Sequence, residues 1–125
     1  DFTYNDLIFD EGITTDTRDV LRVGVEQKLP TVTKLDERRI EFKITEPFAP
    51  FLRSAGATAI LPKHILEETV TITDGEGQPL FMSTWGTNTD PAEIIGNGPY
   101  VIKQFVPGER IVFTRNPYYW KKGPN

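Results

Sequence analysis

Hydrophobic and polar residues alternate most clearly in the second half of residues 31–46. Ile40, Phe42 and Ile44 are separated by charged residues, which is the period of a strand with one buried face. We therefore expect these three side chains in the core of an antiparallel hairpin whose turn is 36–38. The other assignments for this hairpin are Val32 and Leu35 on its first arm, and Glu41 and Lys43 facing solvent.

The last thirty residues predict a second hairpin. Two runs rich in β-branched and aromatic residues, 101–106 and 111–114, flank the dipeptide Pro107-Gly108. Proline presets φ for the first central position of a turn, and glycine accepts a positive φ at the next. Before the first strand lies a Gly-Asn-Gly-Pro segment, where we expect a side chain at Gly98 to clash or strain the backbone.

Three segments have apolar residues at helical spacing, namely 2–9, 48–55 and 62–69. In the second segment the spacing of Phe48, Phe51 and Leu52 predicts the buried face. In the third, a proline suits the first turn, and we expect Ile65 and Leu66 to be buried. Short helices together with antiparallel hairpins predict an α+β fold.

Residues that commonly begin or end helices predict further local structure. Asp1 is a candidate cap for the first helix, and Gly56 is expected to end the second. Asp90 is expected to cap a short turn that has Pro91 at its first position.

Composition narrows the class of protein. A chain of 125 residues can bury a real core, and at 38% hydrophobic residues it is globular. The net charge is −4 with both signs interspersed, so the chain lacks the basic stripe that nucleic acid requires. No apolar run approaches the roughly 18 residues that cross a bilayer. The absence of cysteine excludes disulfides and thiolate metal sites.

His64 is the only histidine, with Glu67 and Glu68 about one helical turn further on. A zinc site normally needs at least two more nitrogen or sulfur ligands. The sequence therefore favours a structural role for His64, and we predict no metal ligand and no catalytic residue in this helix.

An oxygen-rich loop spans residues 14–19, with three threonines, Asp16 and Asp19. Calcium takes such ligands, but the spacing differs from that of an EF-hand loop. A solvated loop with local side-chain to backbone bonds is the favoured interpretation. The same holds for the Asp-Gly-Glu-Gly segment at 74–77.

Other candidates for ligand contact are aromatic or glycine-rich. Gly96-x-Gly98 has neither the preceding parallel strand nor the following helix of a phosphate loop, and a ligand contact by Tyr100 is not indicated. Four aromatic residues could stack on a ligand or belong to the core: Trp85, Tyr118, Tyr119 and Trp120. Because no nucleophile–base pair is evident, we predict a non-enzymatic chain without a cofactor and leave its ligand-binding residues unassigned.

Five blocks along the chain, taken in order, resemble one known family. They are 1–8, the strand–turn–strand at 32–44, the Pro-Phe-Ala-Pro-Phe-Leu segment at 47–52, the Ile-Leu-Pro-Lys-His-Ile-Leu-Glu segment at 60–67, and 96–120 with its Gly-Asn-Gly-Pro-Tyr and Arg-Asn-Pro-Tyr-Tyr-Trp ends. The family is the large extracytoplasmic substrate-binding proteins of ABC importers for dipeptides, oligopeptides and nickel, solute-binding protein family 5.

The resemblance implies a role and a place for the chain. It implies capture of a peptide or similar small solute outside the cytoplasmic membrane, at the periplasm or cell surface, and delivery to a membrane permease. The chain is then an internal fragment of the first lobe, which works with a remaining lobe. Residues 1–80 would be its smaller subdomain and 81–125 the connection into its main part. A non-catalytic interaction module, or an enzyme on the same scaffold, remains an alternative.

Overall fold

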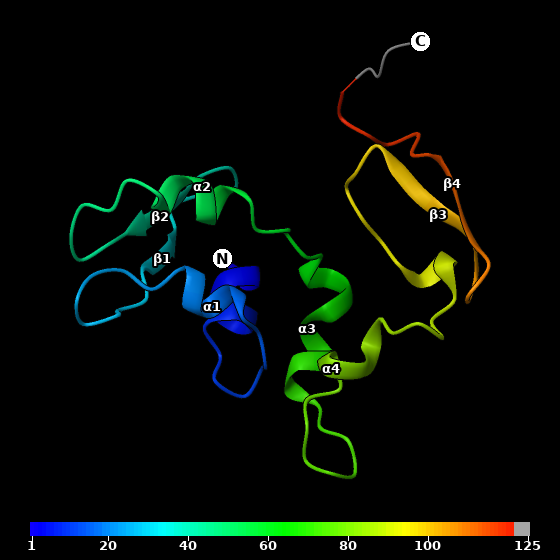
Figure 1. Ribbon diagram of the computed structural model, residues 1–125, viewed down its shortest axis with the longest axis horizontal. Helices are drawn as coiled ribbons and strands as arrows, with labels where there is room; N and C mark the ends of the chain where they lie inside the picture. The colour runs from blue at the N-terminus through cyan, green and yellow to red at the C-terminus, as the bar shows by residue number, and fades with distance from the viewer. Residues whose placement is uncertain (122–125) are drawn as a thin grey trace. The chain divides into compact units, whose positions relative to one another are not determined.

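The computed structural model describes residues 1–121 and divides the chain into two compact units. Unit 1 is Asp1–Met82 and unit 2 is Ser83–Asn125. Each contains one two-stranded antiparallel sheet and short helices (Figure 1). The predicted α+β class is therefore confirmed. Within residues 1–121 no helix combines the length and the apolar character that crossing a membrane requires.

Unit 1 contains most of the helices. Its elements are the π-helix η1 (Thr3–Ile8), α1 (Thr17–Val20), β1 (Thr31–Lys34), β2 (Ile40–Lys43), α2 (Phe51–Gly56) and α3 (Lys63–Thr71), and α4 (Phe81–Thr84) spans its boundary with unit 2. The first helix is a π-helix because the amide of Phe9 donates to the carbonyl of Tyr4, five residues earlier, at 2.8 Å. The Asp1 carboxylate accepts from the amide of Phe2 at 2.8 Å, but Phe2 occupies the N-cap position and no side chain caps the helix, so the expected cap by Asp1 was wrong.

The core of unit 1 forms where the first hairpin meets two helices. Phe42 of β2 lies opposite Val32 of β1, and its ring meets that of Tyr4 edge-on at 4.8 Å. On its other side the ring of Phe51 in α2 lies 5.8 Å away. Leu21 is completely buried in the same cluster. The tyrosine is held in place because its hydroxyl donates to the carbonyl of Ala55 at 2.6 Å.

Several residues expected in this core are exposed instead. Ile40 is exposed because it lies opposite Lys34 at the turn end of the hairpin, beyond the cluster around Phe42. Leu52 is exposed because α2 begins only at Phe51 and buries its i and i+4 positions. Phe48, which lies before α2, and Ile65, which lies beside the buried Leu66, are also exposed, so these expectations of burial were wrong. Leu35, expected on the first arm of the hairpin, lies one residue beyond β1.

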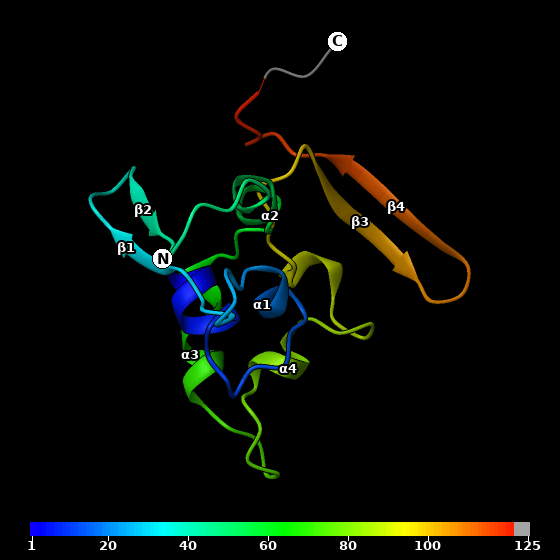
Figure 2. The same cartoon turned by 60° about the vertical axis from the view of Figure 1, so that its left-hand side comes forward.

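Unit 2 is organised around the second hairpin. β3 (Tyr100–Val106) pairs with β4 (Arg110–Arg115) as a long two-stranded ribbon (Figure 2). The turn has the predicted chemistry, since Gly108 has a φ of 73° and the amide of Glu109 donates to the carbonyl of Val106 at 3.0 Å. The 3-10 helix η2 (Pro91–Glu93) is capped as predicted, because the Asp90 carboxylate accepts from the amide of Ala92 at 2.9 Å.

Asn116 connects the two ends of this hairpin. Its side-chain amide donates to the carbonyl of Gly98 at 2.9 Å, and its backbone amide donates to that of Pro99 at 2.9 Å. Its side-chain oxygen accepts from the amide of Tyr118 at 3.0 Å. The expected clash at Gly98 was wrong: its φ is not positive, and an added Cβ would lie 3.8 Å from the carbonyl oxygen of Tyr100, an ordinary contact.

Candidate functional site

Unit 1 contains a pocket of about 630 Å³. Its walls come from η1, the loop that leads into α1, the C-terminal end of α2 and the residue Phe81. The volume lies within the roughly 300–1,000 Å³ that is usual for small-molecule sites. We treat this pocket as the candidate binding site.

The lining of the pocket combines apolar side chains with hydroxyl groups. The apolar residues are Leu7, Ile8, Ile13, Val20, Leu61 and Phe81, together with two alanines. The hydroxyls belong to Thr3, Thr14, Thr15, Thr17, Ser54 and Thr58. Among the described residues that line it, Asp16 is the single ionisable group. Such a lining suits a neutral or cationic ligand that has an apolar part.

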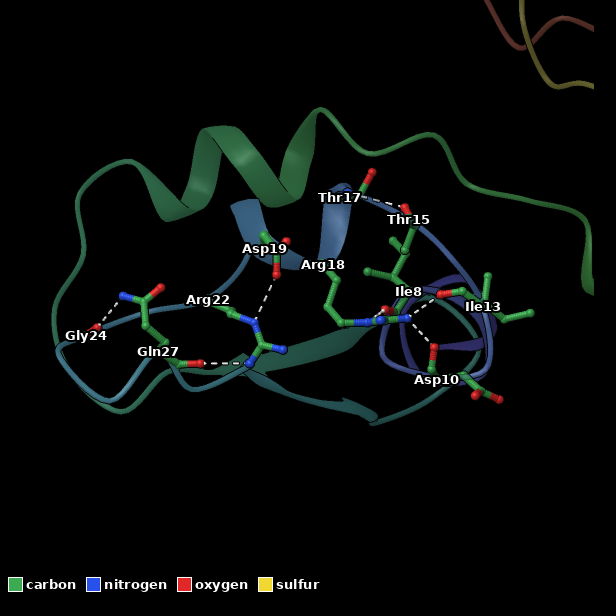
Figure 3. Close-up of polar contacts among 10 residues, drawn as sticks. All are labelled: Ile8, Asp10, Ile13, Thr15, Thr17, Arg18, Asp19, Arg22, Gly24 and Gln27. Carbon is green, nitrogen blue, oxygen red and sulfur yellow. Dashed lines mark hydrogen bonds and ion pairs between the residues drawn. The ribbon is translucent and has the colours of Figure 1, made fainter. Parts of the chain in front are cut away.

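Arg18 holds the loop that forms one wall. Its guanidinium donates to the carbonyls of Ile8 and Ile13, each at 2.6 Å, and to that of Asp10 (Figure 3). These three acceptors lie at the end of η1 and in the loop that follows it, where backbone carbonyls lack helical partners. A rigid fork of N–H donors can satisfy all three together. Arg18 therefore positions the loop.

Two hydrogen bonds hold the part of the lining at and after the end of α2, one between distant segments and one local. The amide of Leu61 donates to the hydroxyl oxygen of Thr3 in η1 at 2.9 Å. The hydroxyl of Thr58 donates to the carbonyl of Ser54 at 3.3 Å, which closes the end of α2. The hydroxyls of Thr3 and Thr58 thus have protein partners.

The chemistry available in the pocket is that of binding. Nucleophilic catalysis requires a nucleophile beside a base, and the described lining holds no histidine, cysteine, lysine or arginine. A lone carboxylate without a proton-transfer partner offers no such pair. Hydrogen bonding and apolar contact are what these residues supply.

His64 lies away from this pocket. It is exposed on α3, and the nearby carboxylate of Glu67 forms an ion pair with Lys63 at 3.1 Å instead. Within residues 1–121 no group of three or more His, Cys, Asp or Glu side chains is placed to hold a metal ion.

The structure separates the two acids of the oxygen-rich loop. Asp16 lines the pocket, whereas Asp19 pairs with the guanidinium of Arg22 at 3.2 Å (Figure 3). Inside the loop, the amide of Thr17 donates to the hydroxyl of Thr15 at 3.2 Å, a local bond of the predicted kind. At 74–77, the carboxylate of Asp74 likewise accepts from the amides two and four residues on, at 2.8 and 2.9 Å.

The aromatic and glycine candidates belong to unit 2 and do not line the pocket of unit 1. Tyr118 and Trp120 are exposed, and Trp85 and Tyr119 are half-buried. The ammonium of Lys121 lies 4.6 Å from the centre of the Trp120 ring. Gly96 and Gly98 lie in the segment before β3, where the carbonyl of Gly98 accepts a hydrogen bond from the side chain of Asn116. Tyr100 is exposed.

Two residues that organise the structure were missed in the sequence. Arg18 lies within the oxygen-rich loop. A basic side chain in that position can donate hydrogen bonds to the backbone carbonyls around it, as Arg18 does to Ile8. Asn116 belongs to the Arg-Asn-Pro segment, but its bond to Gly98 joins residues 18 apart and follows only from the paired strands.

Comparison with known proteins decides the family. The model of the middle part of bacterial extracellular solute-binding proteins, family 5, matches residues 2–125. The chain belongs to this family of solute-binding proteins. The resemblance carried by the five sequence blocks is thereby confirmed.

Relatives from several bacteria agree with this assignment. A protein of Brucella melitensis named as a candidate binding protein is 32% identical over 124 residues, 96% of this chain. The periplasmic oligopeptide-binding protein OppA of Salmonella typhimurium is 33% identical over 91 residues, 71% of this chain. The peptidoglycan-binding protein YepA of Agrobacterium fabrum is 38% identical over 68 residues, 54% of this chain.

This family 5 chain spans only a small part of these relatives. The matched region is 17% of the Brucella protein, 14% of OppA and 9% of YepA. No solved structure matched the chain.

Proposed function

We propose that the chain is part of an extracytoplasmic solute-binding protein that captures peptides and delivers them to an ABC importer. The observation that carries this proposal is the 33% identity to the periplasmic oligopeptide-binding protein OppA over 71% of the chain. The pocket is consistent with it, because its lining offers hydrogen bonds and apolar contacts without catalytic groups.

In this proposal the chain lies in the first of two lobes. Residues 1–80 form its smaller subdomain, and residues 81–125 connect into its main part. The ligand is enclosed by a hinge motion, because contacts from both lobes are made only in the closed state. The site then needs neither a cofactor nor a covalent step, and the permease recognises the closed form.

A peptide derived from peptidoglycan is a second candidate ligand. The Agrobacterium relative named for peptidoglycan binding is 38% identical over 68 residues, a higher identity than OppA over a shorter region. Both candidates share the chemistry of a short peptide, and they differ in the attached sugar and the non-standard residues.

Calorimetry on two proteins tests the proposal. The full-length product of the gene that encodes this sequence is titrated with mixed di- to pentapeptides and, separately, with muropeptides. We expect micromolar binding in one of these arms. The isolated chain should bind nothing tighter than about 1 mM, or about −4 kcal/mol, because it supplies only part of one wall.

Each outcome has a distinct meaning. Binding of muropeptides but not of plain peptides selects the second ligand. Absence of binding in both arms contradicts the capture of peptides. Micromolar binding by the isolated chain contradicts the two-lobed site, since a second wall would then be unnecessary.

A further inference from the structure

The segment before β3 contains an asparagine directly followed by a glycine, Asn97-Gly98. The side-chain carbonyl of an asparagine can be attacked by the backbone amide nitrogen of the next residue, which closes a succinimide ring. Glycine permits this attack most readily, because it has no Cβ beside the nitrogen and its backbone is the least restricted. In a folded chain the reaction depends on whether the structure leaves these two groups free to meet.

The structure leaves both groups free. The side chain of Asn97 is exposed and has no hydrogen-bond partner among residues 1–121. Within the same range the backbone amide of Gly98 donates to no acceptor, although the carbonyl of this residue accepts from Asn116 at 2.9 Å. Apart from its chain neighbours, an added Cβ at Gly98 would meet only the carbonyl oxygen of Tyr100, at 3.8 Å. The attacking nitrogen is therefore neither bonded nor crowded.

Asn88 provides a contrast within unit 2. It is exposed too, but the amide that follows it belongs to Thr89 and donates to the carbonyl of Gly86 at 3.1 Å. The hydroxyl of Thr89 also accepts from the amide of Gly86 at 2.9 Å, which closes the turn. A β-branched side chain further restricts the approach to its own nitrogen. Attack on Asn88 therefore requires the turn to open first.

The remaining asparagines of residues 1–121 are held. The side-chain amide of Asn5 donates to the carbonyl of Val32 at 3.0 Å. Asn116 uses its side chain to bond two backbone groups, and it precedes Pro117, which has no N–H. Among the described asparagines, Asn97 thus combines a free side chain, a free neighbouring amide and an unbranched neighbour.

We propose that Asn97 is a site of spontaneous deamidation in the folded protein. The amide nitrogen of Gly98 loses its proton and forms a bond to Cγ of Asn97, the Cγ–Nδ2 bond breaks, and the side-chain nitrogen leaves as ammonia with that proton. Water then opens the succinimide. Breaking the new bond to Cγ gives aspartate, and breaking the original backbone bond gives isoaspartate. The sum is asparagine and water to aspartate or isoaspartate and ammonia, without an enzyme or an oxidant.

The products differ from the original chain in two ways. Each adds one negative charge to a chain whose net charge is −4, and isoaspartate also adds one methylene group to the main chain. Both changes lie directly before the residue whose carbonyl accepts from Asn116. Because the attacking nitrogen must lose its proton, we expect the rate to rise with pH.

Peptide mapping by mass spectrometry tests the proposal on the full-length product of the gene that encodes this sequence. The protein is incubated at neutral and at mildly alkaline pH, both folded and unfolded in guanidinium chloride. Deamidation is then measured at Asn97 and at Asn88 over time. Isoaspartate is detected separately with an isoaspartyl methyltransferase. The measurement does not depend on which ligand the protein binds.

We expect Asn97 in the folded protein to react within about threefold of its rate in the unfolded protein. In the folded protein it should react at least about tenfold faster than Asn88. Isoaspartate should accumulate at position 97, and the rate should be higher at the higher pH. Protection of Asn97 by more than tenfold on folding, or equal rates at the two asparagines, would overturn the proposal.

Gly98→Ala separates ring closure from direct hydrolysis of the side chain. The added methyl makes only an ordinary contact, so the fold should be retained, but it crowds the attacking nitrogen. We expect deamidation at Asn97 to slow at least about fivefold in this variant. An unchanged rate, or aspartate without isoaspartate in the wild type, would contradict attack by the amide of Gly98. The comparison of Asn97 with Asn88 needs no substitution and decides the proposal even if the variant fails to fold.

Discussion

The two units of the chain differ in how their order arises. Unit 1 buries a set of hydrophobic side chains from its helices and from the hairpin β1–β2, with Leu21 and Leu66 completely enclosed. In the described part of unit 2 the single buried residue is Asn116, and the elements are fixed by a turn, a cap and strand pairing. Unit 1 is thus stabilised mainly by burial and unit 2 mainly by local backbone geometry and hydrogen bonds.

The difference teaches that a strong sequence signal need not mark a stable core. The second hairpin has the most complete turn chemistry in the chain, and yet its large apolar residues Tyr100, Ile111 and Phe113 are exposed. A turn is encoded by a few neighbouring residues, whereas a core requires residues that are distant in sequence to meet. The predictions below test this division, beginning with the core of unit 1.

The largest effect is expected from Leu21→Ala. This side chain is fully buried in the cluster around Tyr4, so its truncation removes apolar contacts and leaves a cavity. We expect unit 1 to lose about 2–5 kcal/mol of its free energy of unfolding, enough to unfold a marginal domain. Hydrogen exchange resolved by peptide should show lost protection across residues 1–82.

Phe113→Ala is the matched truncation in unit 2. Because Phe113 is 56% exposed, the isolated chain should change by no more than about 0.5 kcal/mol in a urea titration. A large loss in the isolated chain would mean that unit 2 has a core of its own, and the comparison would fail.

The second prediction concerns the hydrogen bonds that Arg18 donates to backbone carbonyls. Lysine keeps the charge but cannot present a planar fork to the carbonyls of Ile8, Asp10 and Ile13. We expect Arg18→Lys to destabilise unit 1 by about 1–3 kcal/mol and to loosen the loop at 10–17 first. The control is Arg22→Lys, since Arg22 makes only a surface pair with Asp19 and one bond to a single carbonyl, that of Gln27 at 3.0 Å. Equal effects of the two substitutions would contradict a special role for Arg18.

Local signals in the sequence predicted much of the fold. The position of both hairpins, the positive φ at Gly108 and the cap by Asp90 each depend on a few adjacent residues, and all three are confirmed. Burial was predicted less well: Ile40 and Leu52 fit the expected periods, but short elements leave their ends uncovered.

The candidate site was predicted least well. Its walls join η1 to residues near 58 and to Phe81, which no pattern in the sequence connects. Of the residues singled out beforehand, the threonines and Asp16 of the oxygen-rich loop do line the pocket. They were noticed for their resemblance to cation ligands, whereas the structure supplies a guanidinium that satisfies the loop carbonyls.

The third prediction compares two glycines of unit 2. Gly108 has a φ of 73°, which a residue with a Cβ adopts at a cost of about 1–2 kcal/mol, so Gly108→Ala should weaken the hairpin. Gly98→Ala should change its stability by less than about 0.5 kcal/mol, because the added methyl makes only an ordinary contact with Tyr100. Exchange protection of the β3 and β4 amides measures both. Equal losses of protection in the two variants would show that the backbone at Gly98 also requires a glycine.

The smallest effect is expected from the turn of the hairpin β1–β2, in unit 1. The carboxylate of Asp36 accepts hydrogen bonds from the backbone amide of Arg38 and from the guanidinium of Arg39. Both bonds hold the pKa of this carboxyl below the usual 3.8, and the bond from Arg38 has the larger effect. Because the pKa is lower in the folded state, the charged form contributes stability above the usual value, and this contribution is lost as the pH falls through the folded pKa. Asp36 is exposed, so the contribution is small.

Asp36→Asn isolates this charge, since an amide oxygen can still accept from the amide of Arg38. The urea midpoint of unit 1 should be slightly higher for the wild type than for the variant at neutral pH, and the gap should close as the pH falls below 3.8. An NMR titration of the Asp36 carboxyl in the wild type gives the pKa directly. Two results would contradict this prediction: a carboxyl that titrates at or above 3.8, or a difference in urea midpoint that widens in acid. Either result would show that the turn is held by its backbone alone, as in unit 2.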